Sequence, residues 1–342
     1  MRAAIFHAAG RPLAIENVPD PRPAPDQVII EVERSGICGS DLHVTEYGAA
    51  PDGTILGHEF AGTIAEIGAA VRGDWQVGER VTALPITSCQ QCEACTGGLP
   101  GLCPDNIFTG TTLLVQGAYA EYVASRASML QRLPAGVPFA QGAMVEPLAV
   151  SHHAVEMAAL RPGASVLVIG AGPIGAGVVL FARLAGARHI VVSERFAARR
   201  ERALALGATA VIDPAAEDVA GRFHAHAGCR PQVVFECVGN PGLLRHAVDV
   251  AGIRGRIVVA GVCLLDDTFN PLAGLLKEVT IQFSQCYTER DFGAVIDAMA
   301  RGEAKPEPMH TGTVGFAELP AVFESLRAAS PHCKVLIDPG RR

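Results

Sequence analysis

The sequence has no apolar run approaching the ~18 uninterrupted residues that a transmembrane helix needs. Its most apolar stretch, Ser165 to Leu184, is interrupted by several glycines and a proline. The first six residues lack the long apolar core of a signal peptide and are more typical of an edge strand. We therefore expect a soluble, cytoplasmic protein that does not bind a membrane.

Charge of one sign is also scarce. The chain has 28 Lys and Arg residues against 35 Asp and Glu, for a formal net charge of −7, and the basic residues are scattered. The densest basic segment, residues 195–202, is interrupted by alanines and a glutamate, as on a solvated helix face. This distribution argues against a nucleic-acid surface. We expect a small-molecule partner and no nucleic acid.

Disulfides are not expected either, although the chain has 10 cysteines. In the reducing compartment that the absence of an export signal implies, clustered cysteines are more often metal ligands. The length of 342 residues favours two domains over one, and an apolar fraction of 49% allows a sizeable core.

Two kinds of pattern divide the chain near residue 150. Before it, short strand-like segments alternate with turns rich in glycine and proline, which predicts a β-rich domain. After it, short apolar strands alternate with helices, which predicts a parallel, doubly wound sheet. The fold class is therefore α/β, and helices over 292–299 and 319–328 with a strand over 334–337 are expected to return to the first domain. The predicted domains are 1–149 with 287–342, and 150–286.

The expected elements have definite bounds. Strands are predicted over 3–6, 13–16, 27–32, 59–67, 80–84 and 118–123, and in the second domain over 165–169, 189–193, 210–212, 232–236, 256–260 and 279–283. Helices are predicted there over 148–160, 174–184, 196–206 and 243–251.

A glycine-rich loop follows the apolar strand 165–169 and opens a helix. Its residues are Gly170, Ala171, Gly172, Pro173, Ile174 and Gly175. In such a loop the first glycine makes a tight turn, and the second lets the backbone approach a pyrophosphate at the helix N-terminus. The third permits close packing of helix on sheet. This context makes a dinucleotide site the favoured interpretation.

Glu194 ends the next strand, where a carboxylate can accept both ribose hydroxyls of an adenosine. A 2′-phosphate would meet that negative charge, so NAD is favoured over NADP. Arg195 and Arg199 leave NADP open, because either side chain could fold over a 2′-phosphate.

Four cysteines lie at short intervals in the first half of the chain, at Cys89, Cys92, Cys95 and Cys103. Four thiolates can hold one zinc ion in a closed tetrahedral site, which would stabilise a glycine-rich loop and leave no position for substrate. Two disulfides or an iron–sulfur cluster are the alternatives. Nothing else in the sequence suggests electron transfer, so a structural zinc is preferred.

A second candidate metal site lies earlier in the chain. The stretch from Cys38 to His43 holds a thiol, a hydroxyl, a carboxylate and an imidazole, and His58 and Glu59 follow. A thiolate, an imidazole and a carboxylate suit a catalytic zinc with one position left open. Taken alone, Cys38 and His58 could be buried core residues; the dinucleotide loop and the four cysteines favour the metal site.

Together these motifs resemble the zinc-dependent, medium-chain alcohol dehydrogenase family, especially its polyol branch of sorbitol, butanediol and threonine dehydrogenases. The resemblance covers nearly the whole chain. It rests on Cys38 to His43, Gly57 to Phe60, the Cys89 to Cys103 cluster, Glu146 to Val150 and Gly170 to Gly175. It implies a GroES-like catalytic domain split around a Rossmann domain, with the active site in the cleft between them. It also implies a homo-oligomer, either a dimer or a tetramer.

The resemblance assigns roles by position. Cys38 and His58 look like ligands of the catalytic zinc, and Asp41 looks like the carboxylate that orients His58. Ser40 resembles the hydroxyl that receives the substrate proton, and His43 the imidazole that passes it on. Two further residues resemble cofactor contacts: Val238 beside the nicotinamide and Lys334 near the phosphates.

The third protein ligand of the catalytic zinc is open between Glu59 and Glu146. Zinc with a thiolate, a neutral imidazole and one carboxylate is neutral overall, whereas two direct carboxylates would weaken its Lewis acidity. We therefore expect one direct carboxylate at a time. By resemblance to the polyol branch, Glu59 binds the resting metal and Glu146 holds a water.

The expected activity is hydride transfer between a secondary alcohol or polyol, or the matching ketone, and NAD(H). An NADP-dependent alcohol dehydrogenase or carbonyl reductase of the same family is the alternative, and a non-enzymatic zinc or nucleotide-binding protein is a weaker one. A zinc-free quinone or enone reductase would leave two motif sets unexplained. Several other polar side chains are assigned to helix surfaces or packing: His152, His153, His224, His226, Tyr119 and Tyr122.

Overall fold

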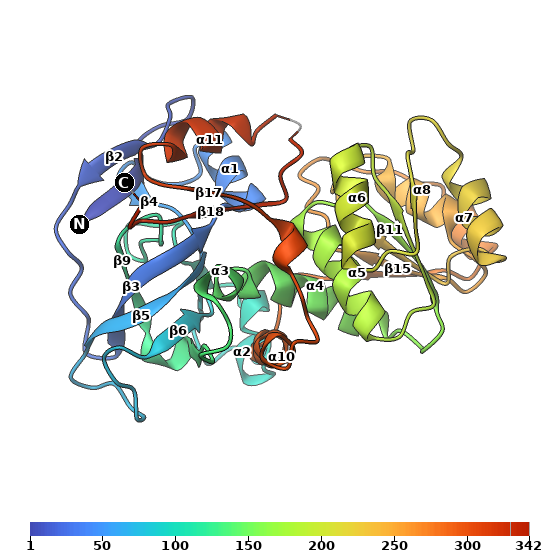
Figure 1. Cartoon of the computed structure of the whole chain (residues 1–342). Coiled ribbons are helices and arrows are strands. Elements are labelled where there is room, and N and C mark those ends of the chain that lie inside the picture. Colours follow the sequence, from blue (N-terminus) through green and yellow to red (C-terminus); the bar gives the residue numbers. More distant parts are fainter. Residues whose placement is uncertain (329, 342) are drawn as a thin grey trace. The chain divides into compact units, whose positions relative to one another are not determined.

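The computed structural model describes residues 1–328 and 330–341 and divides into two compact units. Unit 1 comprises Met1–Glu146, Thr288–Ala300 and His310–Arg342, and unit 2 comprises Pro147–Tyr287 and Arg301–Met309. Unit 1 is therefore built from segments that are far apart in sequence, whereas unit 2 is almost continuous (Figure 1). None of the helices in the described chain is long and apolar enough to cross a bilayer.

Unit 2 is organised around a six-stranded sheet in the order β13-β12-β11-β14-β15-β16, in which every neighbouring pair is parallel. The strand order reverses between β11 and β14, the point where such sheets bind ligands. The strands are β11 (Ser165–Ile169), β12 (His189–Ser193), β13 (Ala210–Ile212), β14 (Val233–Glu236), β15 (Arg256–Val259) and β16 (Thr280–Phe283). The helices are α4 (Val145–Ala158), α5 (Pro173–Leu184), α6 (Ala197–Leu206), α7 (Val219–Ala227), α8 (Leu243–Val250) and α9 (Pro271–Leu275).

The central strand β11 is buried on both faces. Leu167 and Ile169 pack into one core with Phe223 of α7 and Val248 of α8, whereas α5 and α6 lie on the other side of the sheet (Figure 1). A strand covered by helices on both sides needs apolar residues on both faces, which explains the continuous apolar run from Val166 to Ile169. The predicted parallel, doubly wound sheet is confirmed.

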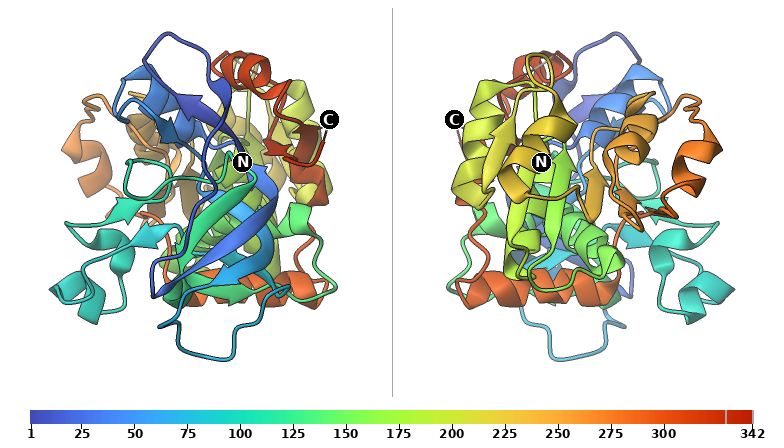
Figure 2. Two further views of the ribbon diagram at one scale, coloured as in Figure 1. Left: turned by 90° about the vertical axis from the view of Figure 1, so that its left-hand side faces the viewer. Right: turned by 90° about the vertical axis from the view of Figure 1, so that its right-hand side faces the viewer.

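Unit 1 is mainly antiparallel. Its main sheet has the order β10-β6-β5-β3-β18-β17, with β9 also paired to β3, and a smaller sheet has the order β2-β1-β4. The long, twisted β3 and β5 face the viewer in the left panel of Figure 2. The strands are β1 (Arg2–Phe6), β2 (Ala14–Asn17), β3 (Gln27–Gly36), β4 (Thr54–Ile55), β5 (Glu59–Ile67), β6 (Arg80–Ala83), β7 (Ile86–Thr87), β8 (Ile107–Phe108), β9 (Tyr122–Arg126), β10 (Leu130–Arg132), β17 (His310–Val314) and β18 (Lys334–Ile337).

Short helices complete this unit: α1 (Gly39–Glu46), α2 (Glu93–Thr96), α3 (Phe139–Gly142), α10 (Glu289–Ala300) and α11 (Leu319–Ser325). Strand β18 pairs with β3 through Leu336 opposite Gly36 and lies between β3 and β17 in the main sheet. The strand expected over 118–123 is shifted to Tyr122–Arg126, and the stretch after Cys38, for which no element was predicted, forms the helix α1.

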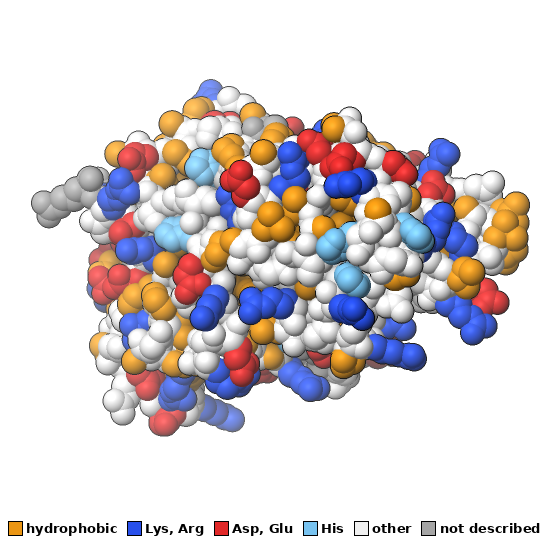
Figure 3. All heavy atoms as spheres, turned by 45° about the vertical axis from the view of Figure 1, so that its right-hand side comes forward, with side chains coloured by type: hydrophobic (Ala, Val, Ile, Leu, Met, Phe, Trp, Pro, Cys, Tyr) orange, Lys and Arg blue, Asp and Glu red, His pale blue; other side chains and the backbone are white. Residues whose placement is uncertain are grey.

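The surface carries both signs of charge. On the face shown in Figure 3, Lys and Arg side chains are interspersed with Asp and Glu, and neither sign forms a continuous field there. This agrees with the scattered basic residues of the sequence and offers no broad basic surface on that face for a nucleic-acid backbone.

Candidate active site and cofactor-binding residues

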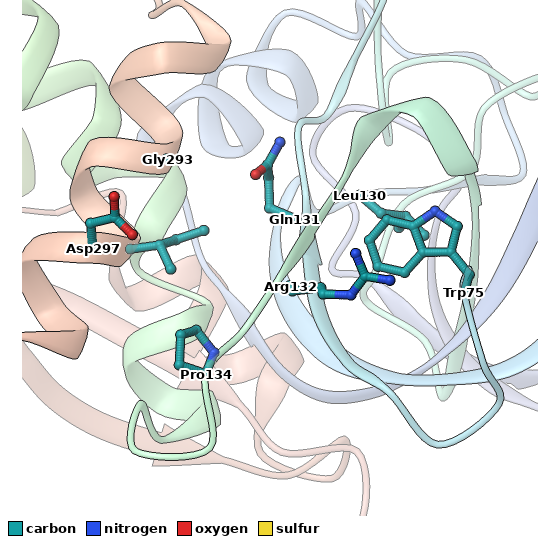
Figure 4. A pocket seen from close by; sticks show the side chains of 8 residues that line it. Trp75, Leu130, Gln131, Arg132, Pro134, Gly293 and Asp297 are labelled. Carbon is teal, nitrogen blue, oxygen red and sulfur yellow. The ribbon is translucent and has the colours of Figure 1, made fainter. Parts of the chain in front are cut away.

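A pocket of about 400 Å³ in unit 1 lies between α10 and β10 (Figure 4). Arg132 forms part of its wall, stacking on Trp75 with its guanidinium carbon 4.2 Å from the ring centroid and pairing with Asp74 at 2.6 Å. The described lining residues include none of the residues predicted for catalysis, metal or cofactor. They are Trp75, Leu130, Gln131, Arg132, Pro134, Gly293, Ile296 and Asp297. The predicted residues gather elsewhere.

Cys38 is the N-cap residue of α1, with φ −101° and ψ 150°. The side chain of Asp41, three residues on, accepts a hydrogen bond from the Cys38 backbone N–H at 3.2 Å. This reciprocal arrangement is a capping box, and it starts a helix that has little amphipathic character of its own. A thiolate is also stabilised near the positive end of a helix. The cap therefore fixes the Cys38 thiol and the Asp41 carboxylate relative to each other.

Cys38, His58 and Glu59 form one group of possible metal ligands, whose ligand atoms all lie within 4.8 Å of one another. The Ser40 hydroxyl lies 3.1 Å from Cys38 Sγ and 3.3 Å from His58 Nε2. The structure thus brings together a thiol, an imidazole, a carboxylate and a hydroxyl, the donor set that fits a catalytic zinc with a proton acceptor beside it.

Asp41 lies behind this group. Its Oδ1 is 3.3 Å from His58 Nδ1, which leaves Nε2 of the same ring facing Ser40. Its Oδ2 accepts a hydrogen bond of 2.6 Å from the hydroxyl of Tyr119. A carboxylate bound to one imidazole nitrogen while the other is available is the usual support of a metal-binding histidine. The position predicted for Asp41 beside His58 is therefore observed.

Asp41 and His58 are both buried, and each shifts the pKa of the other. Burial raises the pKa of Asp41, but the His58 ring and the donors from Tyr119 and Cys38 outweigh it, so the pKa lies below its usual value. Burial lowers the pKa of His58, but the Asp41 and Cys38 charges raise it well above its usual value. Burial and Asp41 also raise the pKa of Tyr119, so its hydroxyl keeps its proton and donates.

Glu59 is paired with Lys334, a partner that the sequence did not reveal. Lys334 Nζ lies 2.6 and 2.7 Å from the two Glu59 carboxylate oxygens and donates at 3.0 Å to the Ile37 carbonyl. The two side chains are 1% and 0% exposed. Lys334 was expected near the cofactor phosphates. The structure places its ammonium against Glu59 instead, because the pairing of β18 with β3 directs the side chain into unit 1.

Gly36 makes room for this ion pair. A Cβ atom at this position would lie 2.1 Å from Glu59 Oε2, far inside van der Waals contact. Glycine is therefore required by the carboxylate, and not by the backbone conformation. Glycine stands on each side of Ile37 and Cys38 in the sequence, but no sequence pattern shows which group approaches Gly36.

Two further residues with predicted roles at the catalytic zinc, Glu146 and His43, lie outside this group of possible ligands. Glu146 is buried in the first turn of α4, and among the described residues it is not a member of the ligand group of Cys38, His58 and Glu59. His43 is exposed on α1, where its ring stacks on Tyr47 and its Nδ1 lies 3.8 Å from a Glu46 carboxylate oxygen.

The four cysteines of the second metal motif converge in a small lobe (teal in Figure 2), with their sulfur atoms within 4.8 Å of one another. Cys92 and Cys103 each have a sulfur neighbour at 3.5 Å, and Cys89 and Cys95 are 3.9 Å apart. Zinc bound tetrahedrally at ~2.3 Å places sulfur atoms about 3.8 Å apart, so the cluster fits this ion. Disulfides need about 2.05 Å, and all ten cysteines, which lie in the described chain, are free thiols.

The local surroundings favour the thiolate form of Cys89 and Cys95 but not of Cys92. The Cys95 N–H lowers the pKa of Cys92, but burial and the neighbouring thiols outweigh it and raise this pKa to about 11. Backbone N–H groups of Gln91 and Cys92 lower the pKa of Cys89 to about 6, and the Ser88 side chain also lowers the pKa of Cys95. Short elements, α2 and a 3₁₀ turn over Pro100–Leu102, are almost all that connects these residues. A lobe with so little core of its own depends on its metal.

Replacing Cys95 with serine is therefore expected to remove one zinc per chain and to lower the midpoint of thermal unfolding. The remaining three thiolates no longer close the tetrahedron, whereas the Cys38 group is untouched. Metal analysis and a thermal melt measure both effects, with Cys263→Ser, an exposed cysteine, as the matched control. A variant that keeps two zinc ions and the wild-type melting temperature would contradict the structural role.

In unit 2, three glycines lie in the loop between β11 and α5 or in the first turn of α5, and a side chain would meet a different obstacle or none at each of them. Gly170 has φ +88°, a left-handed conformation, and a Cβ there would lie 2.4 Å from a Val238 methyl. At Gly175 a Cβ would lie 1.9 Å from the Gly170 carbonyl oxygen. At Gly172, the N-cap of α5, it would meet nothing within 4 Å. Open space over a helix N-terminus fits the pyrophosphate of a dinucleotide.

Glu194 follows β12 and is fixed to this loop. Its carboxylate accepts hydrogen bonds from the Ala171 N–H at 2.8 Å and the Phe196 N–H at 2.9 Å, and it is 6% exposed. Arg199 is 3.9 Å from the same carboxylate, and its guanidinium lies over the Phe196 ring, whereas Arg195 is exposed.

Val238 begins the turn after β14. Its N–H donates to the buried Glu236 carboxylate at 2.7 Å, and its side chain is 41% exposed. The turn continues at Gly239, whose N–H donates to the same carboxylate oxygen at 2.9 Å. Glu236 thereby fixes the backbone beside the glycine-rich loop, a role that the sequence analysis missed.

Comparison with known proteins now identifies the family. Residues 24–135 match the alcohol dehydrogenase GroES-like domain, and residues 173–301 match the zinc-binding dehydrogenase domain. The sorbitol dehydrogenase of Bacillus subtilis is 35% identical over 77% of this chain and 75% of its own length. Human sorbitol dehydrogenase is 31% identical over 94% and 92%, respectively. A protein of Sinorhizobium meliloti 1021, described as a zinc-binding dehydrogenase bound to NADP, superposes with a TM-score of 0.91, with 32% identity and 99% coverage of both chains.

These matches confirm the predicted fold class, a GroES-like domain with a Rossmann domain, and the predicted enzyme class, a zinc-dependent oxidoreductase that uses a nicotinamide cofactor. Two of the structural features described above, the cysteine lobe and the Cys38 group, supply the zinc donor sets that such an enzyme requires. The chain belongs to the zinc-dependent medium-chain alcohol dehydrogenase family, in its polyol dehydrogenase branch.

Proposed function

We propose that the enzyme transfers a hydride between a secondary alcohol or polyol, or the matching ketone, and NAD(H) at a zinc site formed by Cys38, His58 and one carboxylate. The observation that carries this proposal is the placement of the Ser40 hydroxyl 3.1 Å from Cys38 Sγ and 3.3 Å from His58 Nε2. A proton acceptor thus lies beside the metal-binding atoms, where a substrate hydroxyl would be held.

The residues divide the work. When bound, zinc supplies the Lewis acidity that lowers the pKa of a substrate hydroxyl. Ser40 would take up the substrate proton while it gives its own hydroxyl proton on, and His43 would pass a proton towards solvent, consistent with its exposed position on α1. Asp41 holds the His58 ring so that Nε2 is directed at the metal. Alignment of alcohol and nicotinamide supplies the remaining acceleration, because the hydride chemistry belongs to the cofactor.

Glu59 is the carboxylate that we propose as the resting zinc ligand, with Glu146 holding a water. Charge supports this choice. Zinc, one thiolate and one carboxylate are neutral together, and the Lys334 ammonium beside Glu59 adds one positive charge that preserves Lewis acidity. The same ammonium allows the Glu146 carboxylate to approach without making the site negative.

NAD is the proposed cofactor, bound by the loop residues Gly170, Gly172, Pro173, Ile174 and Gly175 and by Val238. Glu194 supports NAD over NADP, because its buried carboxylate is fixed to the loop by two N–H groups and would repel a 2′-phosphate. Arg199 partly offsets this charge at 3.9 Å, and Arg195 is exposed beside it, so NADP is the alternative that a test must include.

The test is the appearance of reduced cofactor by its near-ultraviolet absorbance when the zinc-loaded enzyme is mixed with secondary alcohols, diols and polyols, in parallel with NAD and with NADP. Turnover of at least one secondary alcohol or polyol with NAD, abolished by removing the catalytic zinc, is the expected result. A preference for NADP would overturn the role of Glu194 alone. Zinc-loaded enzyme that oxidises no alcohol with either cofactor would overturn the proposed activity.

The resemblance to this family also leads to proposals for the domain limits and the cellular location. We propose a catalytic domain of residues 1–149 and 287–342 and a dinucleotide-binding domain of residues 150–286. We also propose a cytoplasmic location, because clustered cysteines act as metal ligands in a reducing compartment.

A homodimer formed along the edge of the unit 2 sheet is also proposed, with a tetramer as a further assembly. In the described chain β16 pairs on one side only, with β15. Large apolar side chains on and beside this edge are more than half exposed, and a soluble monomer rarely exposes so many together. They are Val262, Leu264, Leu265, Leu272, Leu275, Leu276 and Phe283.

Replacing Leu275 and Leu276 together with glutamate is expected to reduce the mass in light scattering to that of a smaller assembly, because four negative charges would face one another across the dimer. The control is Leu114→Glu, a change at an equally exposed leucine in unit 1. A wild-type protein that scatters as a 35.7 kDa monomer would refute the proposal.

A further inference from the structure

Behind the proposed zinc site lies a buried hydroxyl to which none of the roles above has been assigned. We propose that Tyr119 is a positioning residue of the catalytic zinc site, which fixes Asp41 and through it the His58 ring. This inference rests on the proposed function, since it concerns the same metal site. The sequence favoured strand packing as the role of Tyr119 over a place in the lining of the cleft.

The hydrogen bonds form a continuous chain. The Tyr119 hydroxyl donates to Asp41 Oδ2 at 2.6 Å, and the other oxygen of this carboxylate faces His58 Nδ1 at 3.3 Å. Asp41 Oδ2 also accepts the Cys38 N–H at 3.2 Å. One carboxylate therefore connects the backbone of one proposed ligand to the ring of the other, and Tyr119 supplies the shortest bond to it.

The ring of Tyr119 is fixed as firmly as its hydroxyl. The residue is 0% exposed and packs edge-on against Phe323, with ring centroids 6.3 Å apart. Its ring also lies against Gly57, where a Cβ would come within 2.3 Å of a ring carbon. Gly57 has φ +96° and directly precedes His58. Tyr119 thus contacts two neighbours of His58, the Asp41 carboxylate that faces its ring and Gly57, which precedes it in the chain.

The backbone of Tyr119 adds to this contact. Its N–H donates to the Leu56 carbonyl at 2.9 Å, and the N–H of Ala118 donates to the Gly57 carbonyl at the same distance. A buried hydrogen bond to a charged group is stronger than one between neutral groups and restricts the carboxylate to one rotamer. Without the hydroxyl, Asp41 keeps its bonds to Cys38 and His58, but its Oδ2 loses the shorter of its two hydrogen bonds.

The test is Tyr119→Phe, which keeps the ring and removes only the hydroxyl. Loss of an outer hydrogen-bond partner typically weakens metal binding by ~10–100-fold, and for a partner one bond further away we expect about 3- to 30-fold. Competition with a chelator measures the affinity of both zinc sites in the same chain. The four-cysteine site, which Tyr119 does not touch, is the internal reference and is expected to be unchanged.

Cobalt(II) in the catalytic site supplies a second readout, because its visible absorption responds to ligand geometry. We expect Tyr119→Phe to shift this spectrum, and Phe323→Leu, which loosens the same packing but leaves the hydroxyl, to leave it unchanged. The proposal is overturned if Tyr119→Phe alters neither zinc affinity nor the cobalt spectrum, or if Phe323→Leu alters them equally. If wild-type enzyme holds no metal at Cys38 and His58, the proposed function fails instead.

Discussion

Replacing Cys38 with serine is expected to lower the rate of alcohol oxidation at least ~1,000-fold, while NADH still binds. The several kcal/mol that a Lewis acid contributes to charge stabilisation correspond to this factor. A serine hydroxyl is a far weaker zinc ligand than a thiolate, so one zinc per chain should be lost. NADH binding is retained because the glycine-rich loop belongs to unit 2, whereas Cys38 belongs to unit 1. Steady-state rates, metal analysis and a fluorescence titration with NADH check the three expectations.

The matched control for this change is Cys229→Ser, since Cys229 lies outside both groups of possible metal ligands. It should leave the rate and the zinc content unchanged. Full activity in a metal-free Cys38→Ala protein would show that the hydride transfer does not depend on this metal.

Replacing Lys334 with methionine is expected to destabilise unit 1 of the metal-free protein by about 3–5 kcal/mol, the usual cost of leaving a buried charge without its partner. The change leaves the Glu59 carboxylate at 0% exposure with no ammonium. Denaturant unfolding followed by the fluorescence of Trp75, which lies in unit 1, measures the loss. The free energy of unfolding should recover in part when Glu59 is also changed to glutamine, because the uncompensated charge is then removed.

A surface pair of the same length separates burial from pairing. Arg254 and Glu278 are also 2.6 Å apart but are 78% and 65% exposed. Arg254→Met should cost at most ~1 kcal/mol, as exposed ion pairs usually do. Equal losses at the two sites would show that the burial of Lys334 is not what makes its ion pair important.

Local patterns allowed the sequence to predict the unit 2 sheet and both zinc donor sets. The strand β11 is apolar from Val166 to Ile169 because helices cover both of its faces, and the glycine-rich loop follows it directly. The four cysteines lie within one short lobe, so their spacing alone indicated a common ion. In each case the residues that meet in space are close in sequence or follow a periodic pattern.

Residues missed by the sequence analysis meet through the fold. Lys334 reaches Glu59 only because β18 pairs with β3 in a particular register, and no local pattern encodes that register. The Tyr119 hydroxyl meets Asp41 across 78 positions of sequence. Helix α1 was missed for another reason: its eight residues lack the apolar periodicity of a longer helix, and its cap, Cys38, is not among the residues that usually begin one.

The distance between Glu59 and Lys334 along the chain also has a consequence for synthesis. These residues are separated by 275 positions, and ribosomes add about 5–20 residues per second. Lys334 is therefore synthesised on the order of 10–60 s after Glu59. Throughout that interval the whole of the dinucleotide-binding unit is made, because its sequence interrupts that of unit 1. A nascent chain can therefore complete its cofactor-binding sheet before the carboxylate of its proposed metal site can be buried at low cost. Metal loading at Cys38 and His58 would then be a late event in the life of each new molecule.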